Sequence, residues 1–151
     1  MEVTERKINN GRKWLLIIVM MLSALIANAQ EGLNVAKVFE LYGHAKGCKM
    51  VEMSNTNIRG YDLKVYKSLS YKTIGKSVAP YLDADRKNAR KIREVVDNGH
   101  ITSGYYMMPS VVKGVNRYIL FSKVNERQGV VIYIEGALAP NDIMKLCYSK
   151  R

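Results

Sequence analysis

The sequence predicts an α+β fold, with a mostly antiparallel sheet of about five strands and helices packed mainly on one face. Some segments repeat apolar residues with the helical period, and others alternate polar with apolar side chains as strands do. Most strand segments are joined by short turns, which favours antiparallel neighbours because parallel strands need a long crossover. The predicted order is α-β-β-α-β-β-β-α in a single domain over residues 30–151.

Three helices are expected after Gly32. The first has apolar residues at i, i+3, i+4 and i+7, namely Val35, Val38, Phe39 and Tyr42, and ends at Gly43 or Gly47. The second begins at the N-cap Asp83, has the inner stripe Ala89, Ile92 and Val96, and stops at Gly99. The third begins at Pro140, with Asp142 in its first turn and the stripe Ile143, Leu146 and Cys147.

Five strand segments are expected, covering residues 49–54, 63–74, 105–110, 115–124 and 129–135. Residues 55–60 form a turn, and residues 75–80 break the pattern. A short polar connection makes the last two strands an antiparallel hairpin. The run VVIYIE is apolar on both sides, which predicts a central strand for residues 129–135.

The first 29 residues have the layout of a secretory signal peptide. Arg6, Lys7, Arg12 and Lys13 precede an apolar run over residues 15–27, and small residues precede a cleavage site after Ala29. The run has 13 residues, whereas a membrane-spanning helix needs about 18 or more. An uncleaved anchor and a core helix are the alternatives. The expected mature protein begins near Gln30 and is periplasmic or secreted, so it meets a membrane only during export.

The mature chain is strongly basic. Without residues 1–29 it keeps 20 Lys and Arg against 11 Asp and Glu, so its net charge is +9 rather than +11. Long-range attraction would concentrate anions around such a protein. For an exported protein, the expected counter-charges are acidic glycans and anionic lipid head groups rather than nucleic acid.

Cys48 and Cys147 are the two cysteines of the chain. In an oxidising compartment they could form a disulfide bridge that ties the first strand to the last helix. The alternative, which the sequence favours, is two small buried thiols, because Cys147 falls on an apolar helical stripe. Neither cysteine has a second ligand at metal-binding spacing, so no metal site is expected.

The segments YLDADRKNARKIREVVDNG and YILFSKVNERQGVVIYIEGALAPNDIMKL resemble small exported α+β proteins of Bacteroidota that are classed as domains of unknown function. The likeness covers roughly residues 33–146. It implies a two-layer fold and a periplasmic or outer-envelope location, and it supplies no catalytic residues. Some relatives are associated with envelope sigma-factor systems, which would imply a protein partner.

Two surfaces are candidate binding sites. The basic side of the second predicted helix forms a candidate anion-binding face, made of Arg86, Lys87, Arg90, Lys91 and Arg93. On the polar side of the second strand, Lys64, Tyr66 and Lys72 could stack on sugar rings and pair with acidic groups. The alternatives are an ordinary solvated helix face and an ordinary strand rich in tyrosine.

No catalytic signature is present. The sequence lacks a phosphate-binding loop, a dinucleotide fingerprint, a zinc-binding helix and a nucleophile elbow, and no cofactor is expected. Asp97, His100 and Ser103 offer an acid, a base and a nucleophile only by closeness in sequence. The function we expect is therefore non-enzymatic binding of another envelope protein or of an anionic envelope component. The alternative is an unrecognised hydrolase that uses His100.

Overall fold

The computed structural model describes residues 11–14 and 32–148. The chain divides into two units, residues 1–33 and 34–151, and residues 11–14 of the first unit are helical. Apart from those four residues, the predicted leader of residues 1–29 lies outside the described part. No helix within the described residues is long and apolar enough to cross a membrane.

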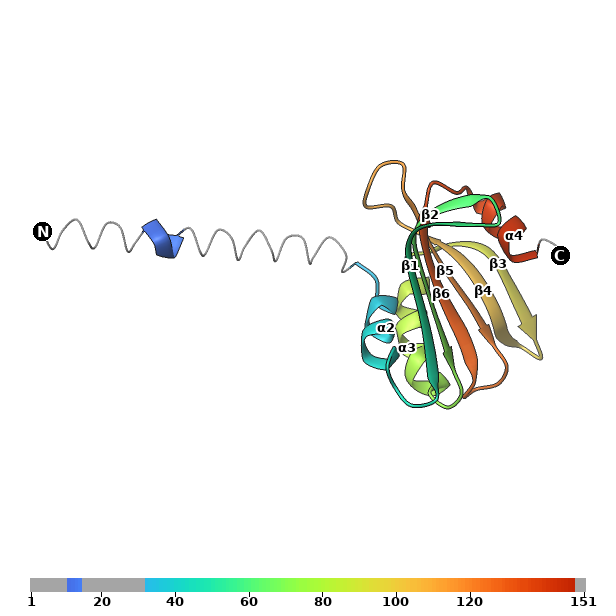
Figure 1. Cartoon of the computed structure of the whole chain (residues 1–151). Coiled ribbons are helices and arrows are strands. Elements are labelled where there is room, and N and C mark those ends of the chain that lie inside the picture. Colours follow the sequence, from blue (N-terminus) through green and yellow to red (C-terminus); the bar gives the residue numbers. More distant parts are fainter. Residues whose placement is uncertain (1–10, 15–31, 149–151) are drawn as a thin grey trace, which may run out of the picture. The chain divides into compact units, whose positions relative to one another are not determined.

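The second unit is an α+β domain with a six-stranded antiparallel sheet, one strand more than predicted. The element order is α2 (Val35–Tyr42), β1 (Cys48–Ile58), β2 (Tyr61–Tyr71), α3 (Gly75–Arg86), β3 (Arg90–Asp97), β4 (His100–Met108), β5 (Asn116–Lys123), β6 (Gly129–Gly136) and α4 (Pro140–Tyr148). The strands lie in the order β1-β2-β6-β5-β4-β3 (Figure 1). The β1–β2 hairpin and the β3–β6 meander are therefore joined by the pairing of β2 with β6.

The helices lie on opposite faces of this sheet. Tyr118 and Ile119 are neighbours on β5, so their side chains point to opposite faces. Tyr118 packs in a cluster with residues of α4, whereas Ile119 lies beside Leu82 of α3. Because α2 packs against α3, these two helices share what we call the α3 face, and α4 covers part of the α4 face (Figure 1). Placement of helices mainly on one face thus holds for α2 and α3.

Apolar side chains from β2, β5, β6 and the connection before α4 hold α4 against the sheet. This core cluster consists of Leu63, Tyr118, Leu120, Ile134, Leu138, Ile143 and Leu146. Leu63 is 1% exposed, and it belongs here because the register of β2 shifts between Leu63 and Val65. A regular two-residue alternation along β2 would place Leu63 on the same side as Val65, and it fails at that bulge, since a bulge inserts an extra residue between paired positions.

The helix predicted from Asp83 to Gly99 is wrong. The structure has the end of α3 at Arg86 and then an edge strand, β3. The pairing of β3 with β4 shifts register between Lys91 and Arg93, where Ile92 is an extra residue in β3. This bulge breaks the two-residue alternation and leaves a spacing that imitates a helical stripe. Asn98 and Gly99 have φ angles of 48° and 79°, so they form the turn of the β3–β4 hairpin rather than a helix stop.

The sequence did not predict α3. This helix begins at Gly75, where residues 75–80 were expected to break the strand pattern. At the start of α3, the backbone N–H of Gly75 donates to the carbonyl oxygen of Arg127 at 2.9 Å. A Cβ at Gly75 would lie 2.2 Å from the carbonyl oxygen of Glu126, so only glycine permits this contact with the β5–β6 hairpin. Pro80 lies inside α3 on its exposed side. The backbone acceptor that proline leaves without a donor can therefore bond to water.

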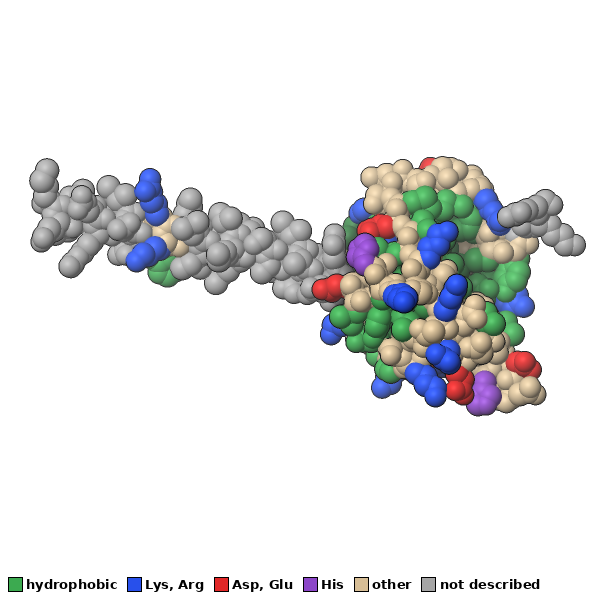
Figure 2. All heavy atoms as spheres, turned by 60° about the horizontal axis from the view of Figure 1, so that its bottom comes forward, with side chains coloured by type: hydrophobic (Ala, Val, Ile, Leu, Met, Phe, Trp, Pro, Cys, Tyr) green, Lys and Arg blue, Asp and Glu red, His purple; other side chains and the backbone are tan. Residues whose placement is uncertain are grey.

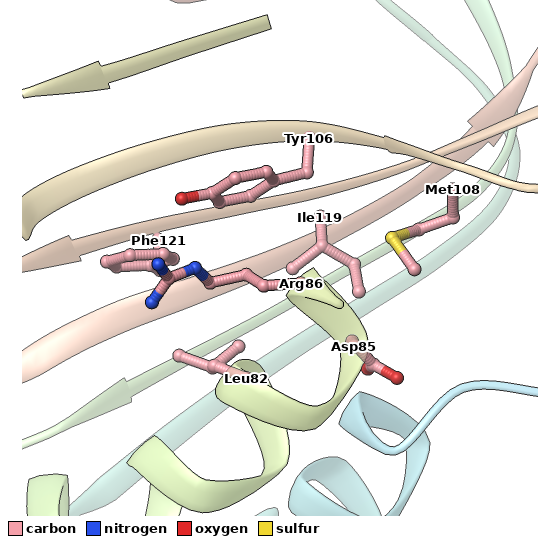
Figure 3. Close-up of a pocket in the computed structure, with 7 residues that line it drawn as sticks. All are labelled: Leu82, Asp85, Arg86, Tyr106, Met108, Ile119 and Phe121. Atoms are coloured by element: carbon pink, nitrogen blue, oxygen red, sulfur yellow. The ribbon is translucent and has the colours of Figure 1, made fainter. Parts of the chain in front are cut away.

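Asp85, at the end of α3, caps the start of α2. Asp85 is 4% exposed, and its carboxylate accepts hydrogen bonds from the backbone N–H groups of Asn34 and Val35, both at 2.8 Å, and from the Asn34 side-chain amide at 3.0 Å. Figure 3 shows Asp85 pointing away from the sheet, while Arg86 points toward Phe121. A carboxylate at a helix N-terminus satisfies unpaired donors and interacts favourably with the helix dipole.

Arg86 attaches α3 to the sheet through Tyr106 and Glu94. Its guanidinium carbon lies 5.8 Å from the centre of the Tyr106 ring, and Arg86 Nη2 lies 3.8 Å from Glu94 Oε1. The Tyr106 hydroxyl donates to the same oxygen at 2.6 Å, and Lys91 Nζ lies 3.5 Å from Glu94 Oε2. The Tyr106 hydrogen bond, helped by Lys91 and Arg86, lowers the pKa of Glu94 below its ordinary value.

The Asp85 cap predicts a large stability difference between two aspartates of the same helix. Asp85→Ala should lower the free energy of unfolding by about 3 kcal/mol, because buried backbone donors lose their acceptor and α2 loses its cap. Asp83→Ala is the control, because Asp83 is exposed and forms a surface ion pair with Arg86 at 2.9 Å. It should cost about 0.5 kcal/mol. Urea unfolding measures both, and equal losses would contradict the cap.

Glu94 predicts a specific pH dependence of stability. Its pKa is lower in the folded protein, so ionised Glu94 stabilises the fold above the ordinary pKa of about 4.3, and this contribution is lost as pH falls through the lower folded pKa. Glu94→Gln should therefore be less stable than wild type by about 1 kcal/mol between about pH 5 and 7, and the difference should shrink below about pH 4.

The control for Glu94 is Glu126→Gln. Glu126 lies in an exposed hairpin with Lys76 Nζ 3.7 Å away, and its side chain is 84% exposed. Denaturant unfolding at several pH values should show no comparable pH-dependent difference for this variant. A Glu94→Gln difference that stays constant down to pH 3 would contradict the assignment.

Candidate functional site

A cleft beside α4 is the best candidate site in the described part of the chain. It has a volume of about 660 Å³ and is lined by Arg59, Tyr61, Arg93, Met144, Lys145 and Tyr148. Three of these residues are basic and none is acidic, and the remainder supply two aromatic rings and a thioether. We call this site the α4 cleft. Ligand sites in proteins commonly have volumes of about 300–1,000 Å³.

The lining residues come from distant parts of the sheet. Arg59 lies in the β1–β2 turn, Tyr61 begins β2, and Arg93 lies on β3 at the opposite edge of the sheet. The other three come from α4, whose buried residues Ile143 and Leu146 hold it against the sheet. The cleft therefore exists only in the folded domain.

The connection before α4 fixes where that helix starts. The carbonyl oxygen of Leu138 accepts hydrogen bonds from the Asn116 amide, at 2.8 Å, and from the Tyr118 hydroxyl. The backbone N–H of Ala139 donates to the Asp142 carboxylate at 3.0 Å. These bonds attach the start of α4 to β5 and so position the lining residues farther along the helix.

Arg93 is held by tyrosines at the end of α4. Its guanidinium carbon lies 4.9 Å from the centre of the Tyr148 ring. The Tyr148 hydroxyl donates to the Tyr105 hydroxyl at 3.0 Å, and the two ring centres are 5.9 Å apart. Burial, with the Tyr148 hydrogen bond, raises the pKa of Tyr105. Tyr105 therefore stays uncharged near neutral pH, and Tyr148 orients Arg93 by stacking.

Arg59 binds the end of α4 from the opposite side. Its Nη1 donates to the carbonyl oxygen of Leu146 at 2.7 Å. Arg59 and Gly60 have φ angles of 52° and 87°, so the side chain projects from a tight turn, and Asn57 Oδ1 accepts from the Gly60 N–H at 3.0 Å. A cation at a helix C-terminus interacts favourably with the last carbonyl groups.

The predicted anion-binding face does not exist as one surface. Arg86 and Lys91 are engaged by Glu94 on the α3 face, and Lys87 is exposed just after α3. Arg90 and Arg93 belong to β3, where they pair with Met107 and Tyr105, and Arg93 alone of the five lines the α4 cleft. In Figure 2, basic side chains are spread over the visible face of the second unit rather than gathered in one patch.

The predicted sheet-face site is not assembled either. Tyr66 is partly buried and packs against the core cluster. Lys64 and Lys72 are exposed, and Lys72 lies beyond the end of β2. Eight residues of extended chain span about 26 Å, so the two lysines cannot bind one small ligand together.

His100 and Ser103 are not arranged as base and nucleophile. Both lie on β4 and are three residues apart, which separates their Cα atoms by about 10 Å along an extended strand. Ser103 Oγ donates to Ser122 Oγ at 3.2 Å, and His100 pairs with Asp97 across the exposed hairpin turn. A nucleophile and its base need to be within hydrogen-bond reach, which this arrangement does not provide.

Cys48 and Cys147 are both free, so the candidate disulfide is not formed. Cys48 starts β1, whereas Cys147 follows Leu146, which is bonded to Arg59 beyond the other end of β1. That strand is about 33 Å long, and a disulfide needs Cα atoms within about 7 Å. The expectation of two buried thiols is also wrong, because Cys48 is partly buried and Cys147 is exposed. Desolvation of the Cys147 thiol raises its pKa, whereas the positive charge of Arg59 acts to lower it.

Of the six residues that line the α4 cleft, the sequence predicted Arg93 as a binding residue and did not predict the other five. Lys145 and Tyr148 did carry a local signal, because residues three apart share one side of a helix. No local pattern connects them with Arg59, Tyr61 and Arg93, which reach the cleft from separate strands.

A second cavity, under α3, has no room for a ligand. It is lined by Leu82, Asp85, Arg86, Tyr106, Met108, Ile119 and Phe121 (Figure 3). The space open to a water-sized sphere is about 0 Å³, so the cavity is part of the packing between α3 and the sheet. Among the described residues, no three side chains of the metal-ligating types His, Cys, Asp and Glu converge.

Comparison with known proteins gives a family without an assigned function. No curated protein matches the chain. No solved structure matches it. A family model matches residues 22–147, which is most of the chain and includes every strand and almost all of α4. The chain therefore belongs to the family of unknown function DUF6108.

Proposed function

We propose that this protein is an exported, non-enzymatic envelope protein of Bacteroidota that binds an anionic envelope component in the α4 cleft. The observation that supports this most is the lining of the cleft, in which three basic side chains and no acidic one surround about 660 Å³. An anion entering the cleft would meet Arg93 and Lys145 without a competing carboxylate in the wall.

Two features of the sequence agree with this proposal. The leader layout over residues 1–29 directs the domain out of the cytoplasm, where acidic glycans and lipopolysaccharide phosphates are abundant anions. The net charge of +9 for the remaining chain would raise the local concentration of such molecules. The hydrolase hypothesis has no comparable support, because Ser103 donates its hydroxyl to Ser122 rather than to His100.

Export predicts removal of the leader. Intact mass spectrometry of protein from cells expressing the full chain should give a mature species that begins at Gln30, because the small residues before Gln30 form the cleavage site. The species should be found in the periplasmic or extracellular fraction. Full-length protein confined to the cytosol would contradict export and leave the cleft chemistry to be tested separately.

Anion binding predicts a charge-specific loss of affinity. The double variant Arg93→Ala/Lys145→Ala should bind heparin and lipopolysaccharide about tenfold more weakly, because two charge-assisted contacts are removed. Elution from a heparin column should shift to lower salt, and binding should weaken as salt rises, because ions screen exposed charges.

The matched control is Lys87→Ala/Lys113→Ala. It removes the same number of positive charges from exposed positions outside the cleft lining. Its elution should remain close to that of wild type. Equal shifts for the two double variants would overturn the cleft as the binding site, and absence of retention at low salt would overturn anion binding itself. Thermal melting checks that each variant is folded.

A further inference from the structure

We propose that the α4 cleft recognises an acidic sugar, with the sugar ring against Tyr61 and its carboxylate or phosphate held by Arg93 and Lys145. This inference rests on the proposed function and specifies the ligand class. It starts from the mixed lining of the cleft, which contains basic side chains together with aromatic and thioether groups.

The two tyrosines of the cleft have different surroundings. Tyr148 is engaged by Arg93 at 4.9 Å from its ring centre, and its hydroxyl is bonded to Tyr105. Tyr148 therefore orients the guanidinium. Tyr61 is partly buried against the core cluster and also lines the cleft, so it offers a ring held in place by packing.

Such a ring suits a sugar better than a bare inorganic anion. The face of an aromatic ring carries partial negative charge, and the C–H groups on the face of a pyranose carry partial positive charge, so the two attract each other. A bare phosphate or sulfate has no apolar face and would gain nothing from Tyr61 or Met144. The volume of about 660 Å³ is also far larger than one small inorganic anion needs.

The basic groups define the charged part of the ligand. Arg93 presents a planar guanidinium stacked on Tyr148, a geometry suited to two parallel hydrogen bonds with a carboxylate or phosphate. Lys145 adds a compact charge from the neighbouring turn of α4. A neutral sugar would leave both cations without a counter-charge.

Calorimetric titration of protein purified from cells expressing the full chain tests this assignment with four probes. Oligogalacturonate supplies ring and carboxylate, a malto-oligosaccharide of equal length supplies the ring alone, tripolyphosphate supplies charge alone, and adenosine monophosphate supplies an aromatic base with a phosphate. We expect oligogalacturonate to bind at least about tenfold more tightly than each of the other three. Equal or tighter binding of tripolyphosphate would overturn the sugar assignment, and so would tighter binding of adenosine monophosphate.

Substitution of Tyr61 separates the ring from the charges. Tyr61→Ala should weaken oligogalacturonate binding about fivefold and leave tripolyphosphate binding unchanged. Tyr61→Leu keeps apolar bulk against the core, so it provides the same test if the alanine variant does not fold. The matched control is Tyr81→Ala, which removes a partly buried tyrosine from α3 and should leave oligogalacturonate binding unchanged.

The outcomes distinguish this inference from the proposed function. If Arg93→Ala/Lys145→Ala weakens binding but neither Tyr61 variant does, the cleft binds anions and the sugar assignment is wrong. If none of these variants weakens binding, both proposals are wrong. Vesicles containing intact lipopolysaccharide, compared with its deacylated saccharide, identify the source. Equal affinity would indicate the sugar itself, and binding to vesicles alone would overturn recognition of the sugar.

Discussion

The pairing of β2 with β6 is the constraint on which the rest of the domain depends. It joins the β1–β2 hairpin to the β3–β6 meander, and without it neither part would have a continuous sheet to pack on. Its register runs from Tyr71 opposite Gly129 to Leu63 opposite Gly136, with the bulge near Leu63. That bulge turns Leu63 into the core cluster under α4. A slip by one residue would move this side chain to the other face and remove part of the support for the cleft.

The twist of this sheet explains how residues from its two edges share one site. In a flat sheet, strands at the positions of β1 and β3 would lie about 24 Å apart. Strand twist accumulates across a sheet, and in Figure 1 the β1–β2 turn lies near α4 together with β3. α4 connects the two edges, because Arg59 binds its last turn while Arg93 stacks on Tyr148 at its end. The cleft is therefore a consequence of tertiary structure.

Local patterns predicted the fold class but not the second helix or the site. Strand-like patterns and turn residues identified β1, β2, β5 and β6, and Pro140 with an apolar helical stripe identified α4. β3 was mistaken for a helix because the bulge at Ile92 leaves apolar residues at a spacing that imitates a helix. α3 was missed because its start depends on a tertiary contact, between Gly75 and the carbonyl group of Arg127. Of the predicted site residues, Arg93 alone lines the cleft, since strand pairing rather than helix periodicity sets its direction.

The α4 cleft holds like charges together by weak interactions. Arg93 stacks on Tyr148, which is worth about 0.5–1 kcal/mol at a partly exposed site, and stacking leaves the N–H edge of its guanidinium available. Arg59 is drawn to the negative end of α4 through the carbonyl oxygen of Leu146. On the α3 face, Arg86 and Lys91 have Glu94 as a counter-charge. The domain thus neutralises cations where α3 packs and leaves the α4 cleft without an acidic lining residue, which is the distribution that an anionic ligand would complete.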